Sequence, residues 1–294
     1  MMMMSRAGRR AASRAQFLRV AFCAFCAFCA FARLSSCFAD DASDLSDQPR
    51  WASTERRADG STLEFRVDSV SRFIRNERAT KYSTSTVFCD DAAFDFAGDN
   101  GEIVVYTFRT QKYVLIDPLR RVRTEIDESE VDRFLSRIKT ILRERDDAFS
   151  AFMTQPSFEV AQKEHEYFFQ SKWIDYRVET VAFDDEQIAD LYFRFLDAMG
   201  KLNVYMNPGV VTPLARIEMN RRFMNDSRFP EKVFAEIYPK GKTIFTKTFQ
   251  VENESTFARR ISVRDRDRIN RAAHFYAQFP FVSFKTYFDK TSGK

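Results

Sequence analysis

Three cysteines near the N-terminus have the spacing of ligands to a metal cluster. The stretch VAFCAFCAFCAFARLSSC (20–37) places Cys23, Cys26 and Cys29 at C-x-x-C-x-x-C spacing. An iron–sulfur site needs four thiolates on a backbone that turns so that they converge. Only Ala-Phe pairs separate these cysteines, and no glycine or proline turns the chain. The pattern therefore indicates a low-complexity apolar repeat, and we expect no cofactor and no metal.

The apolar run has the setting of a secretory signal. Five arginines lie between Arg6 and Arg19, and no acidic residue precedes Asp40. A basic region, a short apolar region and a small-residue cleavage site define such a signal. The run Val20–Ala32 has 13 residues, whereas a bilayer span needs about 20. Residues 1–39 therefore predict a signal peptide, and we expect a periplasmic or extracellular product.

The end of the signal has two interpretations. Residues 37–39, Cys-Phe-Ala, precede Asp40 and offer small residues at both positions that a signal peptidase reads. Alternatively, Leu-Ser-Ser-Cys at 34–37 resembles the lipobox of bacterial lipoproteins, and that resemblance implies acylation of Cys37. Arg33 interrupts the apolar run before this box, which favours the soluble product. We expect membrane attachment only if Cys37 is acylated.

The net charge belongs to the leader rather than to the mature chain. Residues 1–39 hold six of the 46 Lys and Arg residues and none of the 42 Asp and Glu residues, so the remainder has a formal net charge of −2. Nucleic-acid binding is therefore not expected. Cys89 is the one cysteine after Cys37; it can form no internal disulfide and is expected in the core.

Few side chains after the leader have the spacing of an active site. His165 and His274 belong to no metal pattern, and no nucleophile elbow or phosphate loop occurs. A non-enzymatic protein is the favoured interpretation, although a hydrolase with carboxylates far apart in sequence stays open. The segment TPLARIEMNRRFMN (212–225) carries Arg216, Arg221 and Arg222. These arginines form either a face for an anionic headgroup or the paired face of an amphipathic helix, and the second is favoured.

Hydrophobic periodicity predicts one α+β domain at 61–294, after a disordered lead-in at 40–60 with Trp51 as an apolar anchor. Helices are expected after the capping box Asp127–Glu130, from Asp184–Glu186 to near Gly200, from Thr212 to about Asn225, and from Ser262 to about Gln278. Strands are expected at 63–67, 82–89, 93–97, 102–109, 112–116, 121–126, 158–162, 166–170, 174–183, 233–238, 243–251 and 281–288.

The strand run 63–126, followed by a helix and more strands behind a leader, resembles the bacterial lipoprotein-carrier (Lol) superfamily. The segment GEIVVYTFRTQKYVLIDP (101–118) is similar in rhythm to the central hairpins of that family. The resemblance implies a curved, half-barrel-like antiparallel sheet with several helices packed against it and an apolar cavity for acyl chains. It identifies no ligand residue in this sequence.

Two functions from different classes follow. Phenylalanine makes up 32 of 294 residues, which suits an aromatic-lined concavity for an apolar or lipid-like ligand. The alternative is a secreted structural or protein-interaction domain in which the same rings fill the core. Ligand identity and oligomeric state do not follow from the sequence.

The leader makes a direct prediction about the mature chain. When the protein is produced in an export-competent bacterium, we expect the mature N-terminus at Asp40, because Arg33 weakens the lipobox. Intact mass and N-terminal sequencing measure this. A diacylglyceryl group on Cys37 would contradict the prediction.

Overall fold

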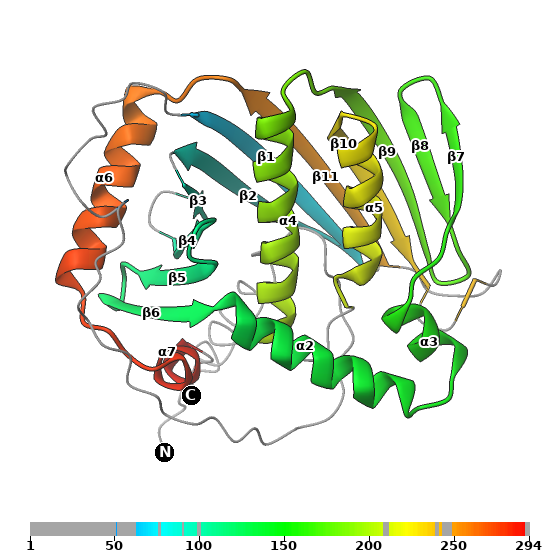
Figure 1. The fold of residues 1–294 in the computed structure, drawn as a ribbon, viewed down its shortest axis with the longest axis horizontal. Helices are drawn as coiled ribbons and strands as arrows, with labels where there is room; N and C mark the ends of the chain where they lie inside the picture. Colours follow the sequence, from blue (N-terminus) through cyan, green and yellow to red (C-terminus); the bar gives the residue numbers. More distant parts are fainter. Residues whose placement is uncertain are drawn as a thin grey trace, which may run out of the picture.

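The computed structural model describes residues 51, 63–75, 78–89, 91–98, 101–207, 212–238, 241–242 and 249–291. The described strands form one 11-stranded sheet in the order β6-β5-β4-β3-β2-β1-β11-β10-β9-β8-β7 (Figure 1). Every neighbouring pair of strands is antiparallel. The fold is therefore α+β with an open, curved antiparallel sheet, as the sequence predicts.

The elements have the following bounds. The strands are β1 (Phe65–Arg75), β2 (Arg78–Cys89), β3 (Ala92–Phe96), β4 (Ile103–Thr107), β5 (Lys112–Asp117), β6 (Val122–Asp127), β7 (Glu159–Lys163), β8 (Glu166–Gln170), β9 (Ile174–Ala182), β10 (Arg228–Ile237) and β11 (Phe249–Ala258). The helices are α2 (Glu128–Arg143), α3 (Ala148–Thr154), α4 (Glu186–Met206), α5 (Leu214–Asn225), α6 (Val263–Gln278) and α7 (Phe284–Thr291).

Two meanders meet in the middle of the sheet. The chain runs outward from β1 to β6, crosses through α2 and α3 to the opposite edge, and returns from β7 to β10. Strand β11 then lies between β10 and β1. The sheet is therefore joined at its centre by strands far apart in sequence.

One face of the sheet, which we call the inner face, packs against α4. Successive side chains of a strand point to opposite faces, so Phe65 and Val67 of β1 lie on the same side and join one buried cluster with α4. The Tyr113 hydroxyl donates to the Ala198 carbonyl oxygen at 2.9 Å, which ties β5 to α4. Figure 1 shows α4 and α5 crossing in front of this face.

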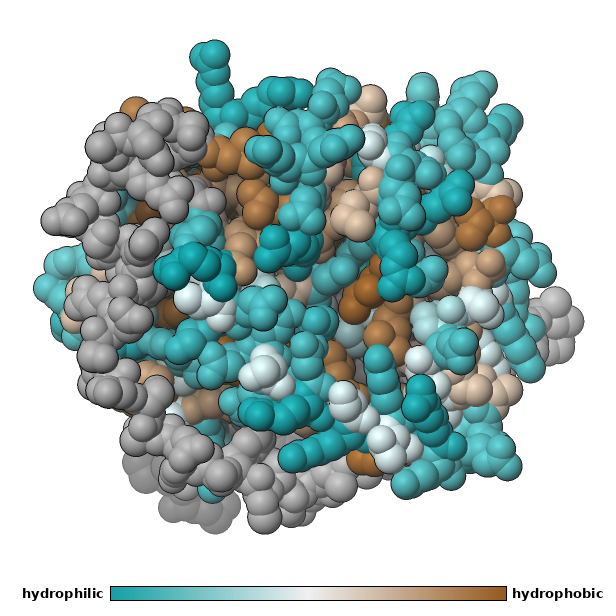
Figure 2. All heavy atoms as spheres, in the orientation of Figure 1, coloured by the Kyte–Doolittle hydropathy of each residue, from teal (hydrophilic) through white to brown (hydrophobic). Residues whose placement is uncertain are grey.

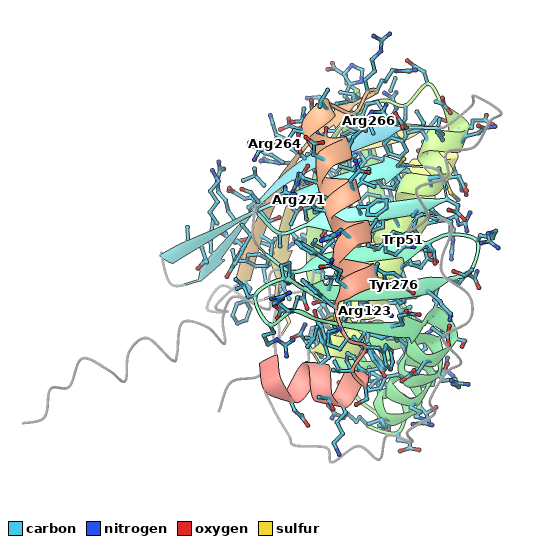
Figure 3. The ribbon with its side chains drawn as sticks, turned by 90° about the vertical axis from the view of Figure 1, so that its left-hand side faces the viewer. Trp51, Arg123, Arg264, Arg266, Arg271 and Tyr276 are labelled. Carbon is cyan, nitrogen blue, oxygen red and sulfur yellow. The ribbon has the colours of Figure 1, made fainter. Side chains whose placement is uncertain are left out.

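The opposite, outer face is covered at β3–β5. Phe94 and Phe96 of β3 pack there against the buried Tyr276 of α6. Trp51 is 8% exposed and lies edge-on to Phe94 and Tyr276, with ring centroids 5.5 and 5.1 Å away (Figure 3). Both faces of β3 and β4 are thus covered, and all their residues are buried. Within the predicted lead-in 40–60, Trp51 is the one described residue, and it belongs to the core.

The prediction for the C-terminal segment 281–288 is wrong. It forms α7 instead of a strand, apart from a single parallel bridge between Arg123 and Phe281. The Thr286 amide donates to the Ser283 hydroxyl at 3.3 Å at the start of this helix. Tyr287 is 1% exposed, so tertiary burial of one helix face outweighs the strand-forming composition.

Helix α4 continues past Gly200, where the sequence predicts its end. A Cβ atom at Gly200 would lie 3.2 Å from the Pro213 Cβ, so this glycine serves the close approach of α4 to the start of α5. The capping box predicted for α2 is also absent: Asp127 makes no side-chain cap, and Glu130 accepts from the Tyr205 hydroxyl. The box at Ser262 and Asp265 is present in α6.

A buried carboxyl in β3 makes stability depend on pH. Asp95 is 4% exposed and accepts from the Thr86 hydroxyl at 2.7 Å. Burial raises its pKa to about 6, against the opposing effects of Thr86 and the Arg268 cation. Because the folded pKa exceeds the unfolded one, the folded state binds more protons between pH 4 and 6, and stability falls as pH rises through this window.

The substitution Asp95→Asn tests this electrostatic cost. We expect the variant to be about 1–3 kcal/mol more stable than the parent chain at pH 7 and to match it near pH 4, where the parent carboxyl is neutral. Urea unfolding at pH 4, 5, 6 and 7 gives the comparison. A stability difference that is the same at all four values would contradict the prediction.

Candidate functional site

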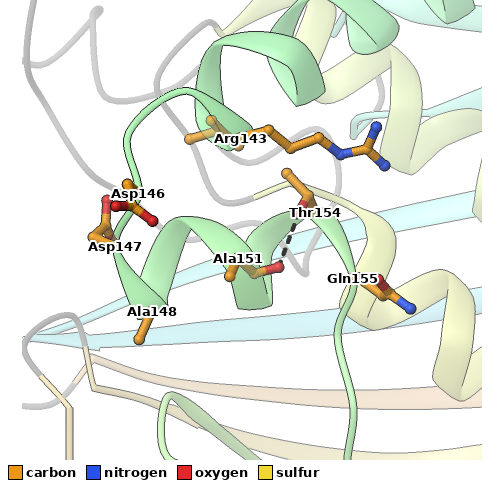
Figure 4. Close-up of a pocket in the computed structure, with 8 residues that line it drawn as sticks. Arg143, Asp146, Asp147, Ala148, Ala151, Thr154 and Gln155 are labelled. Carbon is orange, nitrogen blue, oxygen red and sulfur yellow. Dashed lines mark hydrogen bonds between the residues drawn. The ribbon is translucent and has the colours of Figure 1, made fainter.

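Two hollows flank the short helix α3 and share Ala148, Ala151 and Gln155. The smaller, of about 430 Å³, is also lined by Leu142, Arg143, Asp146, Asp147 and Thr154 (Figure 4). The larger, of about 580 Å³, is also lined by Phe152, Ser157, Phe158, Glu159, Gln170, Ser171, Lys172 and Trp173. We call the larger hollow the α3 groove. Its size falls within the range of small-molecule sites.

Local hydrogen bonds set where α3 begins. Asp147 is the N-cap residue, and its carboxylate accepts from the Ser150 amide at 2.8 Å and the Ser150 hydroxyl at 2.6 Å. These two hydrogen bonds lower the pKa of Asp147. Asp146 precedes it with φ of 48°, a left-handed conformation that Asp tolerates better than most residues. The chain therefore turns sharply between α2 and α3.

A distant hydroxyl holds the other end of α3. Thr212 is 4% exposed, and its hydroxyl donates to the Met153 carbonyl oxygen at 2.5 Å. The sequence predicts Thr212 as the N-cap of the next helix, but Pro213 occupies that position and α5 starts at Leu214. Thr212 thus positions α3 instead of capping α5.

Aromatic rings from helix α3, from the loop before β7 and from the turn between β8 and β9 form one wall of the α3 groove. Phe152 of α3 lies edge-on to Phe158, with centroids 5.6 Å apart. Trp173 lies edge-on to Phe149, with centroids 5.1 Å apart. The Ser171 hydroxyl accepts from the Trp173 amide at 3.1 Å and orients the turn that carries this indole. Neighbouring aromatic rings therefore support this wall, and the hydrogen-bonded turn between β8 and β9 positions Trp173 in it.

The rim of the groove is polar and carries one charge of each sign. Lys172 places its Nζ 4.9 Å from the centroid of the Trp173 ring, a cation–π geometry. Glu159, the first residue of β7, also lines the groove, and Gln155 and Gln170 add amide groups. An apolar wall with a cation at its rim suits a ligand with an apolar part and an anionic head.

The residues predicted for an anionic headgroup are not brought onto one exposed face. Arg216 lies on the buried side of α5 and is 9% exposed. Arg221 pairs with Glu218 at 2.8 Å, and Arg222 pairs with Asp226 at 2.8 Å, so both pair within α5 and its C-cap. Arg216 therefore faces the protein. Anion binding by the other two arginines stays a prediction.

A buried polar contact joins α4 to α5 near Arg216. Asn220 donates to the Asp197 carboxylate at 2.6 Å. Burial raises the pKa of Asp197 to about 6, while Asn220 and the Arg216 cation oppose this rise. The hydrogen bond between Asn220 and Asp197 therefore joins α5 to α4.

The remaining predicted residues lie apart from the groove. His165 and His274 are exposed. Cys89 is half-buried, with its Sγ 3.7 Å from Glu64 Oε1, and packs beside the outer cluster. Cys37 lies outside the described residues. Among the described residues, no group of three His, Cys, Asp or Glu side chains is arranged to hold a metal ion.

We expect Thr212→Val to loosen α3 selectively. Without the hydroxyl, the Met153 carbonyl loses a buried partner, at a cost of about 1–3 kcal/mol. Amide hydrogen exchange in α3 should therefore speed up more than exchange in α4. Thr212→Ser retains the hydroxyl and is the control. Equal exchange in the Val and Ser variants would contradict this role.

Comparison with known proteins assigns no family. No family model and no curated protein matches the chain. A solved structure described as "Structure of PNGF-II in C2 space group" is similar over 78% of this chain and 32% of that chain, with 8% identity and a TM-score of 0.30. The chain thus spans about a third of that protein, and similarity at this level carries no functional argument. None of the helices among the described residues is long and apolar enough to cross a bilayer.

Proposed function

We propose that this chain is an exported, non-enzymatic binding domain that takes an amphiphilic, lipid-like ligand in the α3 groove. The observation that carries the proposal is the combination of an aromatic wall, Phe152, Phe158 and Trp173, with Lys172 at the rim. The apolar part of the ligand would lie on the rings, and an anionic head would meet the Lys172 ammonium. A carboxylate or phosphate supplies such a head.

The α3 groove lies at the β7–β8 edge of the sheet, whereas the sequence leads us to expect a ligand cavity on the sheet's concave face. The lipoprotein-carrier resemblance implies a cavity on the concave face of a half-barrel-like sheet. In the described part of the chain, that face is packed with side chains of α4, and Phe88 meets Phe65 and Phe195 at centroid distances of 4.0 and 5.4 Å. The α3 groove is open to solvent beside this packing, and it remains accessible to a ligand.

A second function is favoured by the same ring packing. If the rings serve the core alone, the chain is a structural or protein-interaction domain. Figure 2 shows that the face over α4 and α5 is mostly hydrophilic, with apolar residues in separate places. Scattered apolar residues of this kind are normal on a monomer surface. This face therefore does not itself indicate a partner.

Tryptophan fluorescence separates the two functions. Trp51 and Trp173 are the two tryptophans of the chain, so a Trp51→Phe background reports on Trp173 alone. We expect a sixteen-carbon fatty acid, added below its critical micelle concentration, to shift Trp173 emission saturably. Lys172→Glu should weaken this binding about tenfold, since losing a charge contact costs about 1.4 kcal/mol.

The control is Leu119→Ser, which changes a side chain 82% exposed and outside the groove. It should bind the fatty acid as the background does. An emission spectrum that stays constant up to the micelle concentration would overturn the proposal and favour the filled-core interaction domain.

A further inference from the structure

The two edge strands of the sheet, β6 and β7, differ in whether another segment of the chain hydrogen-bonds to them. At β6, the Arg123 amide donates to the Pro280 carbonyl oxygen at 3.1 Å, and the Val282 amide donates to the Arg123 carbonyl oxygen at 2.9 Å. The C-terminal segment thus pairs with this edge. At the other edge, β7 pairs with β8 alone, and no described element lies beyond it (Figure 1).

Strand β7 is exposed along its whole length. All five residues, Glu-Val-Ala-Gln-Lys at 159–163, are solvent-exposed, and Val160 is 49% exposed. Each strand at a sheet edge presents unpaired N–H and C=O groups that can pair with another strand. β7 contains no proline, and its pairing with β8 has no bulge. The edge therefore lacks two of the usual features that prevent strand pairing.

The sequence of β7 is complementary to itself in one orientation. Antiparallel pairing centred on Ala161 places Glu159 opposite Lys163 of a second copy, and Lys163 opposite its Glu159. Neither residue forms an ion pair with any part of the chain that the structure describes. Because side chains alternate along a strand, both pairs lie on the same face as Ala161. Cross-strand pairs of opposite charge stabilise such pairing.

Other arrangements are less favourable. Parallel pairing in register would bring Glu159 against its copy and Lys163 against its copy, and like charges directly opposite are destabilising. Shifting the antiparallel register by one residue moves every side chain to the wrong face of the partner. The antiparallel arrangement centred on Ala161 is therefore selected by charge.

We propose that two copies of this chain associate through β7 in a two-fold symmetric pair, which makes one continuous antiparallel sheet. The two-fold symmetry closes the interface, and at the opposite edge Arg123 of β6 is already bridged to Phe281 of the C-terminal segment. The contact is short, so we expect a transient dimer of the class that buries less than about 1,200 Å². The proposed pair needs no ligand in the α3 groove, although Glu159 also lines that groove, so association is measured without fatty acid.

Charge reversal tests the proposal with a built-in rescue. Glu159→Lys and Lys163→Glu each create two like-charge pairs in the homodimer, so each variant alone should dissociate at least tenfold more readily than the parent chain. Mixing the two variants restores opposite charges at both pairs and should recover association. Sedimentation velocity across a concentration series, under reducing conditions, measures all four samples.

The matched control is Arg137→Glu, an exposed charge reversal on α2. It should associate as the parent chain does. Circular dichroism confirms that each variant is folded. A parent chain that stays monomeric at all concentrations, or a mixture of the two variants that associates no better than either alone, would overturn the proposal.

Discussion

The structure depends on the packing of α4 against the inner face of the sheet. This helix buries twelve of its 21 residues, from Ile188 to Tyr205, and each large apolar side chain contributes about 1.5–3 kcal/mol when buried. It also positions α2, because Lys201 lies 2.8 Å from the Glu128 carboxylate and the Tyr205 hydroxyl donates to Glu130. Helix α3 follows α2 through a short turn, so the α3 groove is a consequence of where α4 lies.

Burial differs between the β3–β4 part of the sheet and its β7 edge. Strands β3 and β4 are covered on both faces, by α4 on the inner side and by α6 with Trp51 on the outer side. Strand β9 alternates buried and exposed residues up to Val181, so one face is covered there. Strand β7 is exposed on both. Binding surfaces need accessible side chains and backbone groups, and both proposed surfaces lie at the less covered end.

Local patterns predicted most elements but not α3, and the failures have physical causes. The alternating residues of β1 and the helix start at Ser262 each depend on neighbours in sequence, and both are confirmed. Gly200 is a residue type common at helix ends, but in this fold it allows α4 to approach Pro213 closely. Residues 281–288 have strand composition, yet burial of Tyr287 selects a helix. Trp51 lies in a polar segment, and its partners are more than forty residues away.

The candidate site could not be predicted for the same reason. Phe152 lies in α3, Phe158 in the loop before β7 and Trp173 in the turn between β8 and β9, and each taken alone is an ordinary aromatic residue. The turn after α2 and the Thr212 hydroxyl position α3 beside the other two rings of the groove. The three arginines at 216, 221 and 222 carried the stronger local signal. Arg216 of that helix is nonetheless buried, and Asn220 binds Asp197 of α4. Charge in the sequence does not reveal which side of a helix faces the protein.

The open edge at β7 is different. Once β7 is known to be an edge strand, its five-residue sequence is enough to predict how a second copy would pair with it. Glu159 and Lys163 are the kind of charged residues that limit indiscriminate pairing at an exposed edge. The same two charges, at equal distances from Ala161, favour one orientation and one register with a second copy. These charges disfavour pairing with most other strands, but they are complementary in the pair formed by two copies of β7. The residues that limit aggregation would therefore also give the dimer its specificity.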